Sequence, residues 1–94
     1  MRSYIKVRRV DGESMRPALK HGRVVIGVPA SKLTVGSVVI AEVNNREIIK
    51  RVGKLRAREV FLLGDNQSCS TDSRNFGWIS REQITAKVIW PRLT

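Results

Sequence analysis

Cysteine, aromatic residues and long apolar runs are all scarce in this chain. A single cysteine, Cys69, excludes an internal disulfide and leaves the redox compartment undetermined. Aromatic residues make up 5% of the 94 residues, so we expect a core built from Val, Ile and Leu. No segment approaches the ~20 apolar residues that a transmembrane helix needs, and residues 1–10 lack the apolar stretch of a secretory signal. We therefore expect a soluble or membrane-peripheral chain, in a compartment that the sequence leaves open.

Acidic residues are also few. The chain has 8 acidic and 18 basic residues, which gives a formal net charge of +10. Such a surplus suits nucleic acid, an anionic membrane surface or an acidic substrate. The basic residues are spread along the chain without zinc-finger spacing, a helix-turn-helix pattern or an aromatic RNA-binding motif. We interpret most of them as a solvated surface. Peripheral contact with anionic membrane is the main alternative, and specific nucleic-acid binding is not expected.

Short β-branched runs separated by turns dominate the chain. The runs are Tyr4–Val10, Arg23–Val28, Ser37–Val43, Glu47–Val52, Glu59–Leu63 and Ile84–Trp90. Asn44-Asn45, between two of these runs, predicts a tight hairpin turn. Helix is limited to one or two turns over Met15–Lys20 and a single turn opened by a capping box at Ser80–Gln83. The pattern predicts a single all-β domain over residues 1–94, with a coiled, barrel-like sheet.

Three segments carry residue types that together indicate nucleophilic catalysis. They are Gly12–Pro17 (GESMRP), Ile48–Val52 (IIKRV) and Gly64–Arg74 (GDNQSCSTDSR). A serine hydroxyl needs a base to take its proton. Lysine can do so only when neutral, whereas its free pKa of about 10.4 keeps it charged at neutral pH. On a strand, Lys50 shares a face with Ile48 and Val52, and burial there would lower its pKa. The sequence therefore predicts Ser14 as nucleophile and Lys50 as general base.

The order and spacing of these segments resemble the type I signal peptidase family, the serine–lysine endopeptidases that remove leader peptides. The resemblance extends from about Val10 to Trp90. Residues 12–17 resemble the nucleophile box, and residues 49–52 resemble the general-base box. The box that braces the site is matched by Gly64-Asp65-Asn66, Ser70, Asp72-Ser73-Arg74 and Phe76-Gly77.

The resemblance also implies roles for supporting residues. Ser70 would hydrogen-bond to the lysine amine and orient it, while Asp72 and Arg74 would pair to hold the loop. The backbone N–H of Ser14 would donate into the oxyanion hole. Some family members carry a hydroxyl two residues before the nucleophile, where this chain has Gly12. Backbone groups must then supply more of the oxyanion stabilisation.

The family's fold, as the resemblance implies, is a set of coiled sheets with an SH3-like barrel and one or two short helical turns. Its substrates bind in an extended form, with small residues at the first and third positions before the cut. Four residues match the positions that line those small pockets: Val10, Met15, Leu19 and Ile49.

Most family members carry membrane anchors and a second β-domain between the base box and the bracing box. Only residues 53–63 separate those boxes here. The chain is therefore more similar to short anchorless members, such as nickel superoxide dismutase maturation proteases. The related self-cleaving domains of SOS-type repressors also use Ser and Lys, but they lack the bracing box found at residues 64–74.

Other residues with chemistry of their own have simpler interpretations. His21 stands in a turn-like context without a partner motif, so we expect a surface residue. Cys69 is interpreted as an inert small residue, the alternative being a thiol that modulates the site when oxidised. The acidic residues of Gly64–Arg74 have no His or further carboxylates nearby, which indicates a structural loop and no metal site. Trp78 and Trp90 are expected to be partly buried, with membrane contact as the alternative.

The sequence therefore predicts a small serine endopeptidase of signal peptidase I type. It would remove an N-terminal leader or propeptide after small residues, without a cofactor. Two rival functions stay open, namely a non-catalytic peptide-binding relative and a basic nucleic-acid-binding barrel. The natural substrate, whether a secretory leader or one specific proenzyme, is not determined by the sequence.

Overall fold

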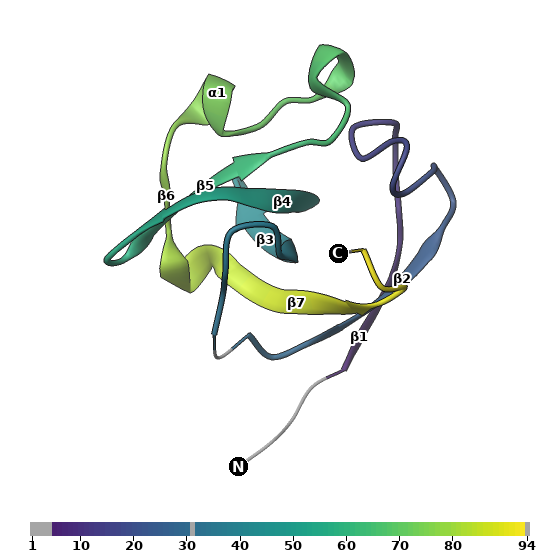
Figure 1. Ribbon diagram of the computed structural model, residues 1–94, viewed down its shortest axis with the longest axis horizontal. Coiled ribbons are helices and arrows are strands. Elements are labelled where there is room, and N and C mark those ends of the chain that lie inside the picture. Colours follow the sequence, from purple (N-terminus) through teal and green to yellow (C-terminus); the bar gives the residue numbers. More distant parts are fainter. Residues whose placement is uncertain (1–4, 31, 94) are drawn as a thin grey trace.

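The structure, a computed structural model, describes residues 5–30 and 32–93, which build one antiparallel sheet of seven strands (Figure 1). In chain order these are β1 (Lys6–Arg9), β2 (Val24–Val28), β3 (Val38–Val43), β4 (Arg46–Arg56), β5 (Glu59–Leu63), β6 (Ile79–Ser80) and β7 (Ile84–Trp90). Their order across the sheet is β1-β2-β7-β3-β4-β5-β6. The all-β class predicted from the β-branched runs is confirmed.

Helix is confined to short segments between strands. They are η1 (Gln67–Cys69), α1 (Ser73–Phe76) and η2 (Arg81–Gln83), of which η1 and η2 are 3₁₀-helical. The capping box predicted before η2 is present, because the Ser80 side chain accepts from Glu82 N–H and Gln83 accepts from Ser80 N–H. Over the described residues, no helix is long and apolar enough to cross a membrane.

The segment after β1 differs from its prediction. Residues 15–20 form turns and not a regular helix, with one helix-like bond from Leu19 N–H to the Met15 carbonyl at 2.8 Å. Pro17 lacks an N–H and so removes a donor from the middle of this short segment. The chain therefore makes a tight turn here without extending into a helix.

Strand β4 is longer than predicted. Gly53 was expected to end it, but the register shifts between Val52 and Lys54 and the strand continues to Arg56. A Cβ at Gly53 would lie 2.6 Å from Leu63 Cδ1, so this irregularity packs Leu63 against a backbone position that only glycine leaves open. The two-residue strand β6 was missed, because it is too short to show an alternating pattern.

The hairpin between β3 and β4 sets the register of the strand that carries Lys50. Val43 pairs with Arg46, and the two residues between them, Asn44 and Asn45, have φ values of 53° and 61°. This is the two-residue turn that the Asn-Asn pair predicted. The same register sets Lys50 opposite Val39 of β3, the strand at the centre of the sheet.

The sheet is strongly coiled. Three strands separate β1 from β4 in the sheet order, which in a flat sheet would hold them about 19 Å apart. Nevertheless, the guanidinium of Arg8 in β1 bonds to the carboxylate of Glu47 in β4. An arginine and a glutamate side chain do not reach across a flat sheet, so the sheet curls until β1 faces β4. This agrees with the predicted coiled, barrel-like form.

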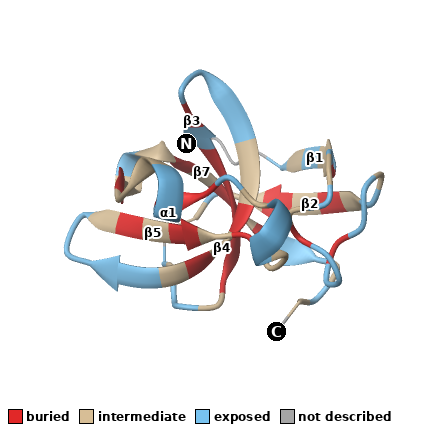
Figure 2. Ribbon diagram, turned by 90° about the horizontal axis from the view of Figure 1, so that it is seen from above, coloured by how far each residue is buried: buried red, intermediate tan, exposed pale blue. Residues whose placement is uncertain are grey.

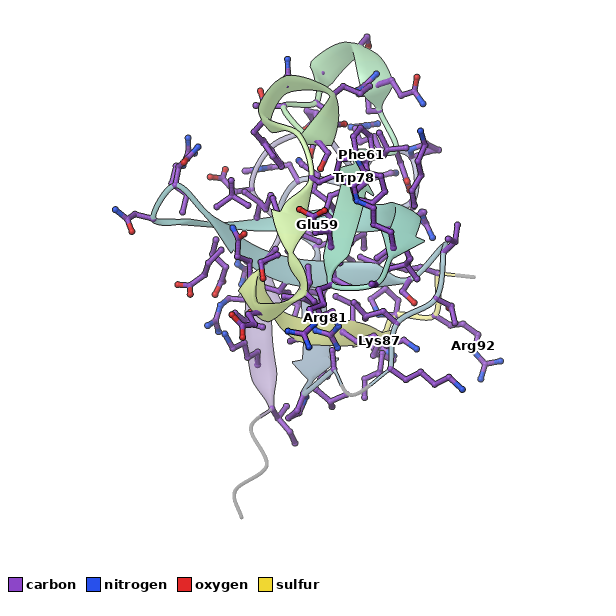
Figure 3. All side chains as sticks on the ribbon, turned by 90° about the vertical axis from the view of Figure 1, so that its left-hand side faces the viewer. Glu59, Phe61, Trp78, Arg81, Lys87 and Arg92 are labelled. Carbon is purple, nitrogen blue, oxygen red and sulfur yellow. The ribbon has the colours of Figure 1, made fainter. Side chains whose placement is uncertain are left out.

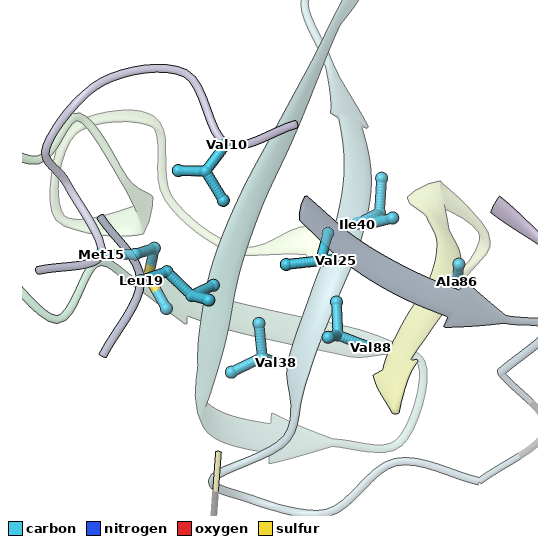
Figure 4. Close-up of a cluster of buried hydrophobic side chains, with 8 residues drawn as sticks. All are labelled: Val10, Met15, Leu19, Val25, Val38, Ile40, Ala86 and Val88. Carbon is cyan, nitrogen blue, oxygen red and sulfur yellow. The ribbon is translucent and has the colours of Figure 1, made fainter. Parts of the chain in front are cut away.

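Aliphatic side chains fill the interior in two clusters, as the composition predicted. The first contains Val10, Met15, Leu19, Val25, Val38, Ile40, Ala86 and Val88 (Figure 4). The second contains Val39, Ala41, Val43, Val52, Val60, Leu62, Ile79 and Ile84. Burial alternates along β2 and β5 with the period of a strand, visible as red and tan bands in Figure 2. Met15 and Leu19 anchor the turn that follows β1 to the first cluster.

Among the described aromatic residues, Phe76 packs against the second cluster, whereas Phe61, Trp78 and Trp90 belong to neither cluster. Phe61 and Trp78 meet edge to face, with ring centroids 5.3 Å apart (Figure 3), and Arg56 lies 4.0 Å from the Trp78 centroid. Trp78 is partly buried, as predicted. Trp90 remains 49% exposed, with the Arg23 guanidinium 5.2 Å from its ring centroid.

Candidate active site

Ser14 and Lys50 lie side by side although 36 positions separate them in the chain. The Lys50 Nζ atom donates to Ser14 Oγ over 2.7 Å. Lys50 projects from β4, and only 6% of the residue is exposed. Ser14 stands in the turn after β1, next to the fully buried Met15. The fold thus brings together the two residues that the sequence predicted as nucleophile and base.

Burial governs the charge of the Lys50 amine. Removal from water lowers its pKa below the ordinary lysine value, and the nearby Asp72 carboxylate opposes this only in part. Among the described residues, Ser14 Oγ is the one hydrogen-bond partner of the amine, so no carboxylate contacts the ammonium form directly. A neutral amine at this distance from a hydroxyl is able to accept its proton.

The loop after β5 holds the Ser14 turn through two hydrogen bonds from Asn66. The Asn66 N–H donates to the Ser14 carbonyl at 2.7 Å, and its side-chain amide donates to the Glu13 carbonyl at 3.1 Å. Gly64 permits this approach, since a Cβ there would lie 2.1 Å from Ser70 Oγ and 2.8 Å from the Ser14 carbonyl oxygen. The sequence predicted a bracing box here, but it carried no signal for the role of Asn66.

The backbone before Ser14 adopts a conformation that favours glycine. Gly12 has φ of 91°, and its N–H donates to His21 Nδ1 at 2.9 Å. His21 is exposed, as predicted, and its ring contacts the turn backbone. Within the described residues, the Ser14 N–H donates no backbone hydrogen bond.

Asp72 is the centre of the bracing loop. Its fully buried carboxylate accepts hydrogen bonds from Gly64 N–H at 2.9 Å, from the Ser70 hydroxyl at 2.9 Å, and from Arg74 backbone and guanidinium groups at 3.0 Å. The predicted pair between Asp72 and Arg74 is therefore present. Burial raises the pKa of this carboxyl, but the hydrogen bonds outweigh burial and hold the pKa well below its usual range.

Ser70 makes a different contact from the one that the resemblance implied. Its hydroxyl donates to Asp72, and no hydrogen bond joins Ser70 to Lys50 within residues 5–30 and 32–93. A serine hydroxyl has one hydrogen to donate, and the charged carboxylate takes it here. Any effect of Ser70 on the lysine amine therefore passes through the position of Asp72.

A second ion pair joins the lysine strand to the bracing loop. Arg51 Nε and Nη2 bond to the two Asp65 carboxylate oxygens at 2.8 and 2.9 Å, and Arg51 Nη1 donates to the Gly36 carbonyl at 2.8 Å. Both residues belong to the boxes found in the sequence, but the pair between them was not predicted. A signal existed in the β4–β5 hairpin, because Arg51 pairs with Leu63, two residues before Asp65.

A cavity of about 360 Å³ opens beside the Ser14–Lys50 pair. Its lining includes the pair itself and three of the four predicted pocket residues, namely Val10, Met15 and Ile49. The fourth, Leu19, is fully buried in the core and does not line the cavity, so it supports the wall from behind. The volume is in the range of ligand-binding clefts.

Cys69 also lines this cavity, and its side chain is exposed. The described part of the chain holds no group of three or more His, Cys, Asp or Glu residues that could bind a metal ion.

Two comparisons with known proteins bear on this geometry. The model of the family described as Peptidase S24-like matches residues 2–89, which include the Ser14 turn, the Lys50 strand and the bracing loop. A search of the curated proteins finds no match.

Proposed function

The chain belongs to the Peptidase S24-like family, and from this premise we propose that it is a serine endopeptidase with Ser14 as nucleophile and Lys50 as general base. The observation that carries the proposal is the 2.7 Å contact between Ser14 Oγ and the Nζ atom of a buried lysine. A histidine base is not needed in this arrangement, because burial lowers the pKa of the lysine.

In the proposed reaction, Ser14 Oγ attacks the scissile carbonyl carbon while the neutral Lys50 amine takes the hydroxyl proton. The carbonyl oxygen becomes an oxyanion, and the Ser14 N–H, which has no backbone partner among the described residues, is suited to donate to it. The lysine ammonium then gives its proton to the leaving amine as the C–N bond breaks, which leaves an acyl-enzyme. Water attacks this ester with Lys50 again as base, and Ser14 is regenerated.

Asp72 is suited to stabilise the Lys50 ammonium that forms during the reaction. Its carboxylate raises the pKa of Lys50 against the larger effect of burial, without a hydrogen bond to the amine. The ammonium that forms during attack is thus partly compensated. We assign Asp72, together with Ser70 and Arg74, a positioning role in the bracing loop.

We further propose that the substrate is the N-terminal leader or propeptide of a protein, cut in the manner of type I signal peptidases. The sequence boxes at residues 12–17, 49–52 and 64–74 support this assignment. The aliphatic lining by Val10 and Ile49 supports small substrate residues at the first and third positions before the cut.

A soluble peptide with Ala at those two positions tests the proposal. Ser14→Ala, Lys50→Ala and Lys50→Arg should each reduce kcat/KM by at least about 10³-fold, with the fold intact by circular dichroism. The double variant should be little worse than either single one, because the two groups act as a unit. Lys54→Ala, an exposed lysine four positions further along β4, is the matched control and should cleave normally. Substantial turnover by Lys50→Ala, or no cleavage by the wild type, contradicts the proposal.

A further inference from the structure

We propose that the part of the cavity lined by Arg8 and Glu47 is a charge-selective subsite, with Lys6 beside Glu47. It would favour an acidic substrate side chain about five residues before the cut and disfavour a basic one. This inference rests on the proposed function and deepens it, because it names a property of the substrate beyond the small residues at the cut.

Three charged side chains meet where β1 faces β4. The Glu47 carboxylate accepts from Arg8 Nε and, at 3.3 Å, from Arg8 Nη2, while Lys6 Nζ lies 3.7 Å away. Arg8 and Glu47 line the same cavity as Ser14 and Lys50. Because β1 and β4 are not neighbours in the sheet, strand pairing does not account for this contact.

The cluster carries an excess of positive charge. Lys6 and Arg8 contribute two positive charges against the negative charge of Glu47. Glu42 lies opposite Glu47 in the β3–β4 register but does not line the cavity, whereas Arg9 and Arg46 do. A further carboxylate from a ligand would therefore meet attraction here, and an ammonium would meet repulsion.

The acidic residues of the cavity lining lie elsewhere, apart from Glu47. Asp11 and Glu13 belong to the turn that carries Ser14, and Glu13 is paired with Arg16 at 2.9 Å. Apart from Glu47, the acidic side chains of the cavity thus lie on the turn, and apart from Lys50, the basic ones lie on β1 or next to the β3–β4 hairpin. An extended substrate would experience this polarity along its length.

The spacing along β1 sets the substrate position that reaches the cluster. Arg8 precedes Val10, which follows directly after β1, by two residues, and two residues span about 6.6 Å in extended chain. Val10 lines the part of the cavity assigned to the small residues up to the third position before the cut. A substrate lying extended beside β1 advances at the same rate, so its fifth residue before the cut reaches the level of Arg8.

The ion pairs of this cluster are partly exposed, so a substrate carboxylate can join them without deep burial. Contacts between partly exposed charges change binding by about twofold to fivefold each. A substrate that changes from Glu to Lys at this position reverses one such contact, so the expected selectivity is about threefold to tenfold.

The test uses three peptides that share small residues at the cut and differ only in carrying Glu, Gln or Lys at the fifth position before it. For the wild type at low salt, kcat/KM should fall in the order Glu, Gln, Lys, mainly through KM, and the differences should shrink at about 0.5 M salt. Arg8→Gln should remove most of the selectivity. Arg56→Gln is the matched control, because Arg56 also pairs with a glutamate, at 2.7 Å, but does not line the cavity.

Binding of the same peptides to Ser14→Ala, measured by fluorescence anisotropy, separates this inference from the proposed function. If the wild type cleaves all three peptides equally well, the subsite is overturned and the peptidase assignment stands. If no peptide is cleaved but Ser14→Ala prefers the Glu peptide through Arg8, the subsite stands and the peptidase assignment falls. Absence of both cleavage and preference overturns both.

Discussion

Lys50 combines a titratable group with an almost fully buried position, and this has a consequence for stability. Burial lowers the pKa of Lys50 in the folded chain, whereas in the unfolded chain the amine keeps its ordinary value of 10.5. Below the folded-state pKa, both states hold the proton and the folded state carries the full cost of the buried charge. As the pH rises toward 10.5, the folded state loses its proton first and gains stability.

We therefore expect Lys50→Met to exceed the wild type in free energy of unfolding near pH 7, with the difference shrinking toward pH 10.5. Urea unfolding at several pH values measures this. Lys54→Met, at an exposed position of the same strand, is the control and should show no such pH-dependent difference. A difference between Lys50→Met and the wild type that does not vary with pH would refute a lowered lysine pKa.

Ser14 and Lys50 could be found from the sequence because the residue types within the three boxes carry the chemistry in order. The partner of Ser70 could not be found in this way. Distance and charge decide whether a hydroxyl bonds to a nearby amine or to a nearby carboxylate. Here the Ser70 hydroxyl donates to the buried Asp72 carboxylate at 2.9 Å. Single-residue roles in a packed loop depend on such competition, which sequence spacing does not resolve.

On the scale of elements, the segment between β5 and α1 is held by one carboxylate. Asp72 serves as the N-cap of α1 and also accepts from Gly64 N–H at the end of β5. Its removal would leave a buried N–H without a partner and release the Ser70 hydroxyl. The bracing loop, and with it the Ser14 turn held by Asn66, would then lose its anchor.

We expect Asp72→Ala to cost about 3 kcal/mol of unfolding free energy and to reduce peptide cleavage. Since the folded-state pKa of Asp72 is depressed, its contribution is complete above the unfolded value of 3.8 and is lost as the pH falls below it. The gap between variant and wild type should therefore narrow in that acidic range. Glu59→Ala, which breaks an exposed pair with Arg56, should cost under about 1 kcal/mol. Equal costs for the two variants would contradict this account of the loop.

Most strands could be predicted, because β-branched runs mark the strands and turn residues mark their ends in the local sequence. The extension of β4 could not, since the irregularity at Gly53 depends on Leu63 packing across from it. Strand β6 and helix α1 are short, and they exist because the neighbouring β5 and the Asp72 cap hold them. The formation of such short elements depends more on tertiary contacts than on the local sequence pattern.

At the scale of the whole molecule, the chain combines a net charge of +10 with an apolar row that runs across β1, β2 and β7. Val7 pairs with Ile26, and Ile26 pairs with Trp90, so the three lie in register across β1, β2 and β7. Val7 and Trp90 are exposed, as is Ile5 just before β1. We propose that this row and the surrounding basic residues give peripheral contact with anionic membranes.

Sedimentation with vesicles tests this proposal. We expect weak binding to anionic vesicles that disappears at about 0.5 M salt, since each basic residue near the surface contributes about 1 kcal/mol. Trp90→Ser should weaken binding, whereas Val35→Ser, at an exposed aliphatic residue outside the row, should not. Cleavage of a soluble peptide should need no lipid. Equal binding to neutral and anionic vesicles would leave the charge as a solvated surface only.

The curl of the sheet brings β1 next to β4. The turn after β1 therefore places Ser14 beside Lys50 of β4. The overall coiled form could be predicted from strand number and length. The contacts that close it, such as Arg8 with Glu47, join residues 39 positions apart and leave no local trace in the sequence.

The pH dependence of kcat/KM for a soluble peptide tests the Ser14–Lys50 assignment most directly. If neutral Lys50 is the base, activity should rise with pH along a single limb whose apparent pKa is that of Lys50 in the free enzyme and lies below 10.5. The limb should persist in His21→Gln, and Lys50→Arg should be inactive at every pH. A profile that is flat from about pH 5 to about pH 10, or a limb that disappears in His21→Gln, would contradict the account.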